Sequence, residues 1–221
     1  MKNSKNIGMI AVVAFAIGIA GFSFSDGKIA LQNDMPMSTS DGASMMGHIE
    51  IIHTDSDGNI IRYLQTDNAI MNAGRNCAAN MLFGTTANTA CDDTTPGYYN
   101  VIALGNGTAF SSDDNTLTAL NTEITGNGLA RTDGTNVVSQ QQAATGTTAG
   151  SSITRISNTY TYSSATASNT ITNAGLFNST SAPSGVFALK ALPGSGVTMN
   201  VGDQLTVNWD ITLTGSDDIT Q

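Results

Sequence analysis

A series of methionines followed by a histidine is the stretch of this chain whose residue types most resemble a metal site. The thioether sulfur of methionine favours Cu(I), and imidazole is also a copper ligand. An exported chain with this series could therefore bind copper. A second interpretation stays open, because methionine is also an ordinary filler of loops and apolar gaps. The copper candidates are Met35, Met37, Met45, Met46 and His48.

No pattern typical of an enzyme accompanies these residues. His48 and His53 are the only histidines, and neither stands in a recognisable Ser-His-Asp context. Gly105-Asn-Gly107 lacks the third glycine, the lysine and the following helix of a phosphate-binding loop. We therefore expect a protein that is not an enzyme and that has no cofactor.

The two cysteines, Cys77 and Cys91, form a lone pair in the chain. An even number of cysteines in an exported protein is typical of a disulfide. A metal or redox pair is the alternative, but the spacing is far from the Cys-x-x-Cys of such sites. The sequence therefore predicts a disulfide that closes a short loop and stabilises the fold by about 3 kcal/mol.

Two short sequences match the acceptor motif for N-glycosylation. They are Asn106-Gly-Thr108 and Asn178-Ser-Thr180, and both fall in predicted loops. Modification requires an accessible asparagine, so the prediction is that the side chains of Asn106 and Asn178 are both exposed.

The charge balance limits the partners that this chain can bind. Its 221 residues include 8 lysines and arginines against 17 aspartates and glutamates, for a formal net charge of −9. A nucleic-acid partner would need clustered basic residues, and none occur outside the N-terminus. We therefore exclude nucleic acid and expect self-association or a surface glycan. The length suits one β-rich domain with a terminal segment.

The N-terminus indicates where the protein acts. Lys2 and Lys5 precede the apolar run Ile7–Phe24, which is the pattern of a secretory signal peptide. The run is also close to the ~17–25 residues that span a bilayer, so an uncleaved anchor stays open. Residues 1–25 are therefore predicted to be a signal peptide or a membrane anchor, with membrane contact only through residues 7–24. Both interpretations place the domain outside the cell or on its surface.

Residues 26–47 have the composition of a flexible arm, rich in Ser, Asp, Gly and Met. Within this arm, Lys28–Gln32 carries Ile29 and Leu31 at the spacing of a β-strand. One hypothesis is that the arm is a plain tether. The other is that Lys28–Gln32 is a donor strand that pairs with the sheet edge of a neighbouring subunit. Ile29 and Leu31 would then enter the neighbouring subunit, and head-to-tail repetition would produce a filament.

The clearest strand of the domain, residues 48–221, is Asp203–Thr214. Apolar and polar residues alternate along it, and successive strand side chains point to opposite faces of a sheet. The apolar positions are predicted to form one buried face around the only tryptophan, with Thr206, Asn208 and Thr212 in a different environment. These apolar positions are Leu205, Val207, Trp209, Ile211 and Leu213.

The rest of the domain is predicted to be short strands with one helix. Asp55–Asn59 joins two strand-like runs through an Asp-Gly pair, which is typical of a hairpin; the position of Gly58 does not fit a calcium loop of the EF-hand type. Asp67–Phe83 has helical spacing, although the helix could begin only after Gly74. Leu117, Leu120 and Ile124 are expected to anchor a long loop, with Glu123 and Arg131 as candidate ion-pair partners. The further predicted strands are His48–Thr54, Ile60–Thr66, Tyr98–Gly105, Leu129–Val138, Ile153–Ser163, Thr170–Asn178 and Val186–Leu192.

A series of short motifs extends over most of the domain, from about His48 to Leu213. The motifs are Asn72–Gly74, Leu82-Phe83, Tyr99–Thr108, Asp114–Leu117, Glu123, Ala130-Arg131, Thr172–Asn178 and Gly202–Leu213. In order and spacing they resemble a family of β-sandwich proteins found as phage and virus tail-associated components and as archaeal cell-surface proteins. The resemblance implies a sandwich fold and carries over no catalytic residues. A typical tail protein is assembled inside the cell, so the export segment departs from that pattern and favours a cell-surface protein.

Together these observations predict an all-β protein. The expected architecture is an antiparallel β-sandwich, jelly-roll or immunoglobulin-like, with one short helix and an N-terminal hydrophobic export or anchor segment. The expected function is that of an exported structural or adhesive protein of the cell surface, assembling into filaments by strand donation. Two alternatives stay open: a virion or tail-like module that binds cell-surface glycans, and an exported copper-binding protein.

Overall fold

The computed structural model describes residues 43–83, 98–110, 114–142, 150–164 and 167–215. Several predictions fall outside these ranges: the apolar run of residues 7–24, the strand with Ile29 and Leu31, and the candidates Met35, Met37 and Cys91. In the described ranges, no helix combines the length and the apolar character needed to cross a membrane.

The described residues are mostly antiparallel β-structure with one short helix, which confirms the all-β prediction. The helix α1 covers Asn72–Phe83. The strands are β1 (Ala43–Thr54), β2 (Ile60–Ile70), β3 (Val101–Gly105), β4 (Thr132–Asp133), β5 (Thr135–Gln142), β6 (Ser151–Thr161), β7 (Asn169–Ile171), β8 (Asn173–Phe177), β9 (Val186–Ala191), β10 (Val197–Met199) and β11 (Gln204–Gly215).

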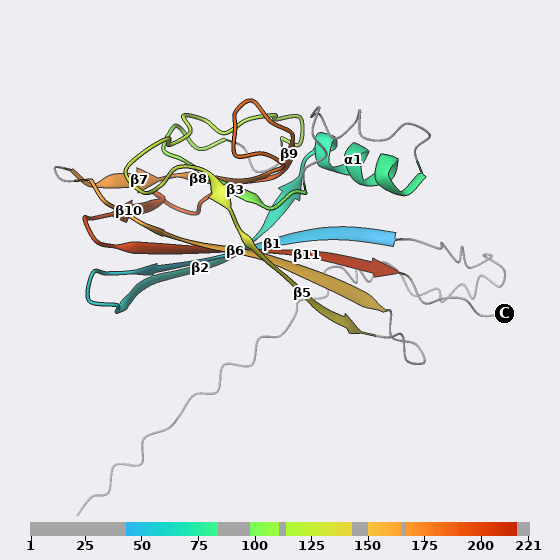
Figure 1. The fold of residues 1–221 in the computed structure, drawn as a ribbon, viewed down its shortest axis with the longest axis horizontal. Coiled ribbons are helices and arrows are strands. Elements are labelled where there is room, and N and C mark those ends of the chain that lie inside the picture. The colour runs from blue at the N-terminus through green and yellow to red at the C-terminus, as the bar shows by residue number, and fades with distance from the viewer. Residues whose placement is uncertain (1–42, 84–97, 111–113, 143–149, 165–166, 216–221) are drawn as a thin grey trace, which may run out of the picture. The chain divides into compact units, whose positions relative to one another are not determined.

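A 9-stranded sheet, in the order β4-β3-β8-β9-β2-β1-β11-β6-β5, makes up most of the domain, and β10 and β7 form a separate pair. β4 and β5 lie at opposite ends of that order, yet only Gly134 separates them along the chain. The two ends of the sheet therefore approach each other, and the sheet is nearly closed. In Figure 1, β1, β2, β5, β6 and β11 form the lower layer, and β3 and β7–β10 lie above them.

The core lies between these layers and includes the predicted face of β11. Leu205, Val207 and Trp209 are fully buried in the main apolar cluster, and Ile211 packs at its margin. Leu213 is 48% exposed, so the prediction of a buried Leu213 is wrong. The alternation of apolar residues in β11 continues to Leu213, although the core beneath the strand ends before that residue. On the opposite face of β11, Asn208 is buried as well.

Two element boundaries differ from the sequence predictions. β1 begins at Ala43, so the folded domain starts before His48 and includes part of the predicted arm. The predicted helix Asp67–Phe83 is wrong in its first turn, because Ala69 and Ile70 extend β2 and pair with β9. The helix begins at Asn72 and passes close to β9. A Cβ on Gly74 would lie 2.6 Å from the carbonyl oxygen of Phe187, so only glycine fits there without displacement.

Two predicted strands are each divided where the chain changes its partner. The prediction Leu129–Val138 becomes β4 on β3 and β5 on β6, and Thr170–Asn178 becomes β7 on β10 and β8 between β3 and β9. β10 had no predicted counterpart. The sequence pattern of a strand continues through each change of pairing partner, so the sequence predicts one strand where the structure has two.

The predicted hairpin between β1 and β2 is confirmed. One carboxylate oxygen of Asp55, Oδ1, accepts hydrogen bonds from the backbone N–H groups of Asp57 at 3.0 Å and Asn59 at 2.8 Å. Gly58 has a φ of 87°, a conformation that suits glycine. The acidic and amide side chains therefore close the turn.

Candidate functional site

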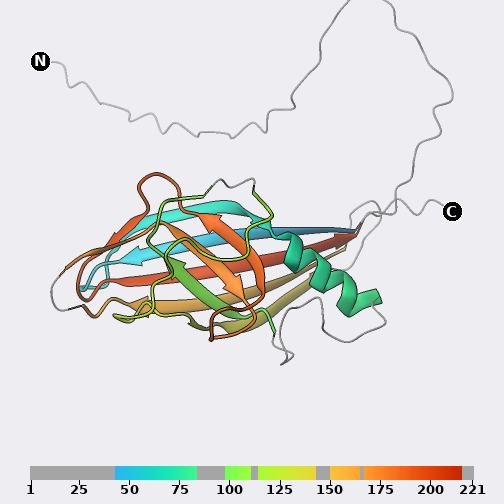
Figure 2. The same cartoon turned by 90° about the horizontal axis from the view of Figure 1, so that it is seen from above.

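The candidate site is a fork where β2 leaves β1. β1 pairs with β11 along all of Ala43–Thr54, but it pairs with β2 only from Gly47 onward. β2 then crosses to β9 through Ala69 and Ile70. Among the described residues, the second edge of β1 at Ala43–Met46 has no strand partner. Figure 2, seen from above, shows β1 and β11 running side by side to the same end of the sheet, with α1 to one side of them.

A cavity of about 340 Å³ opens in the fork. Gly47 helps to shape it, since a Cβ there would lie 2.4 Å from side-chain atoms of Asn68. Apolar side chains from both branches of the fork face polar ones, which is the usual mixture in a binding pocket. The lining residues are Met45, Met46, Gly47, His48, Asp67, Asn68, Ala69, Ile70, Arg75 and Thr212. The fork thus combines an open strand edge with a partly apolar cavity.

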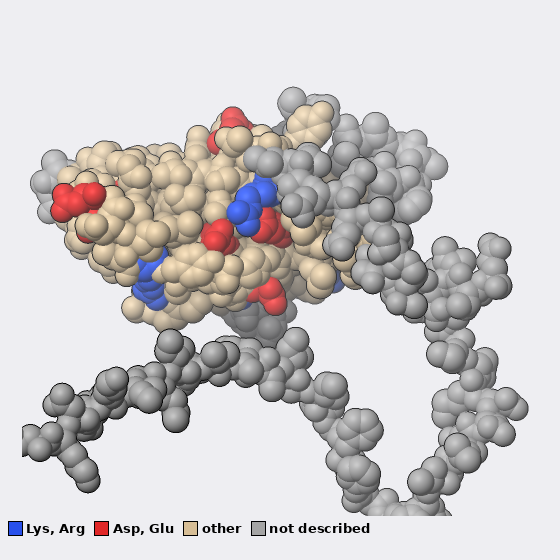
Figure 3. Space-filling view, turned by 90° about the horizontal axis from the view of Figure 1, so that it is seen from below, with Lys and Arg blue, Asp and Glu red and all other residues tan. Residues whose placement is uncertain are grey.

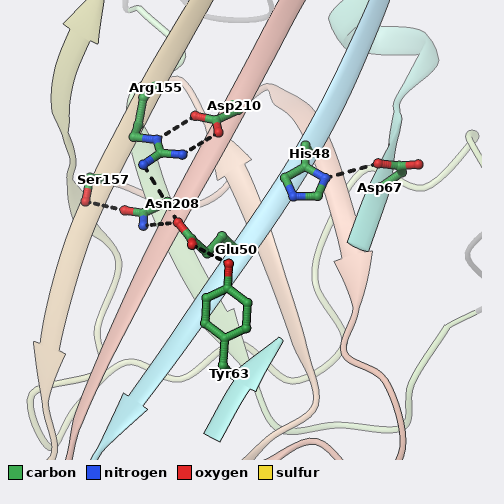
Figure 4. Close-up of polar contacts among 8 residues, drawn as sticks. All are labelled: His48, Glu50, Tyr63, Asp67, Arg155, Ser157, Asn208 and Asp210. Carbon is green, nitrogen blue, oxygen red and sulfur yellow. Dashed lines mark hydrogen bonds and ion pairs between the residues drawn. The ribbon is translucent and has the colours of Figure 1, made fainter. Parts of the chain in front are cut away.

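A row of polar side chains covers the outer face of the lower layer and reaches the fork at His48 and Asp67 (Figure 4). The residues of this outer polar row come from four neighbouring strands: His48 and Glu50 of β1, Tyr63 and Asp67 of β2, Arg155 and Ser157 of β6, and Asn208 and Asp210 of β11. Within each strand they stand at alternate positions, or an even number of positions apart, so they share one face.

Arg155 is paired with two carboxylates of the outer polar row. Its guanidinium group binds Asp210 in a bidentate manner, with Nε to Oδ1 at 2.7 Å and Nη2 to Oδ2 at 2.6 Å. Its Nη1 also lies 3.7 Å from Oε2 of Glu50. These hydrogen bonds to Asp210 raise the pKa of Arg155 further. Two parallel N–H···O bonds fix the orientation as well as the charge, so Arg155 ties β6 to β11 and β1.

Glu50 is the most extensively bonded carboxylate of the row. The hydroxyl of Tyr63 donates to Oε1 at 2.7 Å, and the amide of Asn208 donates to Oε2 at 2.7 Å. Ser157 in turn donates to Oδ1 of Asn208 at 2.6 Å. The hydrogen bonds from Tyr63 and Asn208 lower the pKa of Glu50, and the hydrogen bond between Tyr63 and Glu50 raises the pKa of Tyr63. Glu50 is therefore ionised at neutral pH, which does not suit a general acid.

Most residues of the outer polar row are hydrogen-bonded to one another. Figure 3, which views this face from below, shows mostly uncharged surface with a small group of basic and acidic atoms near the centre. The hydrogen bonds between strands hold neighbouring strands in register. The row therefore supports the sheet beside the fork.

The structure brings three of the copper candidates to the fork. Met45, Met46 and His48 all line the cavity, and Nδ1 of His48 lies 3.1 Å from Oδ1 of Asp67. Met46 is 54% exposed on the face of His48, whereas Met45 packs against the core. His53 lies elsewhere and is buried, with its Nε2 3.0 Å from Oδ2 of Asp203. In the described part of the chain, no group of three or more His, Cys, Asp and Glu could hold a metal ion.

The predicted pair of Glu123 and Arg131 is confirmed. Nε of Arg131 donates to Oε1 of Glu123 at 2.6 Å, and the two side chains are only 7% and 18% exposed. Leu120 and Ile124 are buried and Leu117 packs against the core, so the loop is anchored as predicted.

The two glycosylation candidates differ in exposure. Asn106 is exposed, and its Nδ2 donates to Oδ1 of Asn169 at 3.0 Å. Asn178 is only 6% exposed, so the prediction of an accessible side chain is wrong there. Asn178 directly follows β8, where the chain turns back at the edge of the core. Only Asn106 remains a candidate for modification.

Cys77 is 1% exposed in α1, and Cys91 lies outside the described residues. The bond between Cys77 and Cys91 therefore stays a prediction. Titration of free thiols in denatured, unreduced protein tests this prediction. If Cys77 and Cys91 are bonded, no free thiol should be detected, and detection of two free thiols would contradict the disulfide.

Sequence reasoning missed the β2 side of the fork. The predicted helix includes Asp67, Asn68, Ala69 and Ile70, and no apolar alternation in these four residues indicates a strand. The outer polar row was missed because each of its residues is an ordinary polar strand residue. Only the register of four strands brings them together.

Comparisons with protein-family models, curated proteins and solved structures found no match to this chain. The resemblance to β-sandwich proteins of phage tails and archaeal surfaces therefore stays a prediction.

Proposed function

We propose that this protein is an exported structural subunit of the cell surface that associates with copies of itself by strand addition. The open edge of β1 at Ala43–Met46 carries this proposal, because the sheet stops there while β1 and β11 continue. Unpaired N–H and C=O groups on such an edge form a template for another strand.

Strand addition also needs pockets for the side chains of the added strand. The fork offers such a pocket directly beside the open edge, with Met45, Ala69 and Ile70 among its apolar lining. The arm segment Lys28–Gln32 has the matching pattern, since Ile29 and Leu31 alternate with polar or small residues. The edge and the arm together form the two halves of a head-to-tail contact.

The finer fold assignment belongs to the same proposal. We infer a β-sandwich because the nearly closed sheet folds into two layers with one apolar core between them. A sandwich that carries the predicted arm is a suitable subunit for a surface filament, and the resemblance to tail and surface proteins favours the same architecture.

Electron microscopy of the exported protein tests the proposal. Deleting residues 27–33 should abolish filaments while the domain from Ala43 to Gly215 stays folded, as checked by circular dichroism. Ile29→Ser with Leu31→Ser should act like the deletion. Ala30→Ser with Gln32→Ser is the matched control on the other face of the strand and should preserve filaments. Filaments that survive the deletion, or intact protein that never forms them, would refute strand donation.

A glycan-binding module of the virion or tail type is the second candidate. It is favoured by Tyr63, which is 50% exposed on the outer face beside the bonded carboxylate of Glu50. An aromatic ring with an apolar body and a polar tip can stack on a sugar while its neighbours accept hydrogen bonds. Binding to a glycan array that is lost in Tyr63→Ala and kept in Ile61→Ala would establish this function. No binding by the folded protein would remove it.

Copper binding is favoured by one contact. Asp67 can hold Nδ1–H of His48, which directs the other ring nitrogen outward on the face that also carries Met46. Competition with a chromogenic Cu(I) chelator tests this site. Met46→Leu and His48→Phe should each weaken binding, whereas Met45→Leu, on the opposite face, should not. Equal effects of the two methionine variants would contradict a site at this position.

A further inference from the structure

Four edges of the lower layer lack a strand partner among the described residues: Ala43–Met46 of β1, Ile60–Asn68 of β2, Thr135–Gln142 of β5 and Asn158–Thr161 of β6. The edge on β6 is already covered, because the loop before β4 lies against it: a Cβ on Gly128 would lie 2.0 Å from the carbonyl oxygen of Thr161, and the N–H of Ser163 donates to the carbonyl of Asn127 at 3.0 Å. Sheets discourage unwanted pairing with bulges and with charged residues at their edges. The other three edges differ in these protections, and the difference identifies the one most open to an added strand.

Two of the edges are protected. On β2, Nζ of Lys190 donates to the backbone carbonyl of Asp67, so part of the edge is already bonded. Further along the same strand, Arg62 extends to the carbonyls of Pro193 and Gly196. The edge strand β5 is irregular, because its register on β6 shifts between Ser139 and Gln141. Both features oppose a regular ladder with another strand.

The edge of β1 has neither protection. Its register with β11 runs without a shift from Ala43 to Thr54, so the open part is regular. It also borders the cavity in the fork, which has a volume of about 340 Å³. We propose that the fork between β1 and β2 is the acceptor groove, and that its occupant is Lys28–Gln32 from a neighbouring copy of this chain. This inference rests on the proposed function and specifies where the arm binds.

The arm and the fork match in length and pattern. The open edge is short, and five residues at ~3.3 Å each are enough to cover it. Ile29 and Leu31 would face the side of the fork lined by Met45 and Ile70. Asp67, whose side chain is 93% exposed at the rim, offers an acidic partner for Lys28.

A chain-mixing experiment tests the fork separately from strand donation itself. Ala69→Arg places a long cationic side chain in the fork and keeps the arm, whereas the deletion of residues 27–33 keeps the fork and removes the arm. Each protein alone should remain monomeric by analytical ultracentrifugation. Mixed together, they should form 1:1 dimers, because one supplies the donor and the other the acceptor. Dimers also show that the Ala69→Arg chain is a competent donor.

The other outcomes separate two kinds of failure. Filaments from Ala69→Arg, with none from the deletion protein, would overturn the fork as acceptor and leave the proposed function standing. Filaments from the deletion protein would overturn the proposed function as well. A mixture that stays monomeric would overturn the transfer of the arm between copies.

Photocrosslinking gives a second test, in which the arm and Ala69 are both kept. A benzoylphenylalanine at Met46 should crosslink to the peptide containing Lys28–Gln32, and mixed isotope labelling should show that the two peptides come from different chains. Val201 is the matched control, since Met46 and Val201 are both 54% exposed and Val201 lies at the opposite end of β11. Crosslinks confined to one chain, absent at Met46, or equal at both positions would refute the assignment.

Discussion

Replacing Arg131 by methionine should destabilise the domain strongly, because Arg131 bonds several groups that water barely reaches. Besides its ion pair with Glu123, its Nη1 donates to the carbonyl of Ser179 at 3.0 Å and to the hydroxyl of Ser184 at 2.6 Å. Its guanidinium carbon lies 4.4 Å from the centre of the Phe177 ring. Arg131 therefore fastens the loop after β8 to the loop before β4.

The size of the effect follows from the burial of the pair. With Arg131 only 7% exposed and Glu123 only 18%, removing the cation leaves a carboxylate that is poorly hydrated and unpaired. Breaking a buried pair in this way costs about 3–5 kcal/mol. Arg131→Met combined with Glu123→Gln removes the stranded charge as well, so part of that loss should be recovered. Arg131→Lys keeps the charge but loses the bidentate geometry, so its stability should fall between those of wild type and Arg131→Met.

Urea unfolding followed by the fluorescence of the single tryptophan measures these differences. The free energy of unfolding should decrease in the order wild type, Arg131→Lys, Arg131→Met, with the double variant above Arg131→Met. A loss below about 1 kcal/mol for Arg131→Met would show that the pair behaves like an exposed one. A double variant no more stable than Arg131→Met would refute the argument from the unpaired carboxylate.

Two further predictions concern β11 and the outer polar row. Trp209→Ala should lower the free energy of unfolding by about 3–5 kcal/mol. Leu213→Ala, at an exposed position of the same strand, should change it by less than about 0.5 kcal/mol. Equal losses of stability in the two variants would contradict the boundary of the core. Hydrogen bonds from Tyr63 and Asn208 lower the pKa of Glu50, so the folded state favours the ionised carboxylate and gains stability above the unfolded pKa of about 4.3. The advantage of wild type over Tyr63→Phe should therefore be full at pH 7 and shrink below about pH 4.3, and an advantage that grows in acid would reverse the assigned shift.

The sequence was informative wherever one local rule determined the structure. The hairpin at Asp55–Asn59 follows from its Asp-Gly pair, and the buried positions from Leu205 to Trp209 follow from strict alternation. The pairing of Glu123 with Arg131 was also predictable, since they are opposite charges close together along the chain. Each of these features depends on residues near one another in sequence.

The fork could not be predicted, because it depends on a change of partner. Ile70 is the first apolar residue of the helical spacing that continues through Cys77 and Met81, and only the pairing of Ala69 and Ile70 with β9 places these residues in a strand. The exposed Leu213 is a similar case, since its pattern matches the buried part of β11. The outer polar row needs the register of four strands. In all three cases the structure depends on contacts between residues that are far apart in the sequence.

Gly134 is where the two ends of the sheet meet, and it yields a direct test of the closure. Its N–H donates to the carbonyl of Asn100 at 2.7 Å, so the chain passes from β4 to β5 against the neighbouring strand. A Cβ at Gly134 would lie 2.6 Å from Cγ2 of Ile156, a buried side chain with little room to move, and 3.1 Å from the oxygen of Asn100. Gly134→Ala should therefore cost about 1–3 kcal/mol, as overpacked cores do. Gly126→Ala is the matched control, because no atom lies within 4 Å of its added Cβ and its change should stay within about 0.5 kcal/mol. If both alanine variants are equally stable in urea, the chain at Gly134 has room for a side chain, and the ends of the sheet lie farther apart than this packing requires.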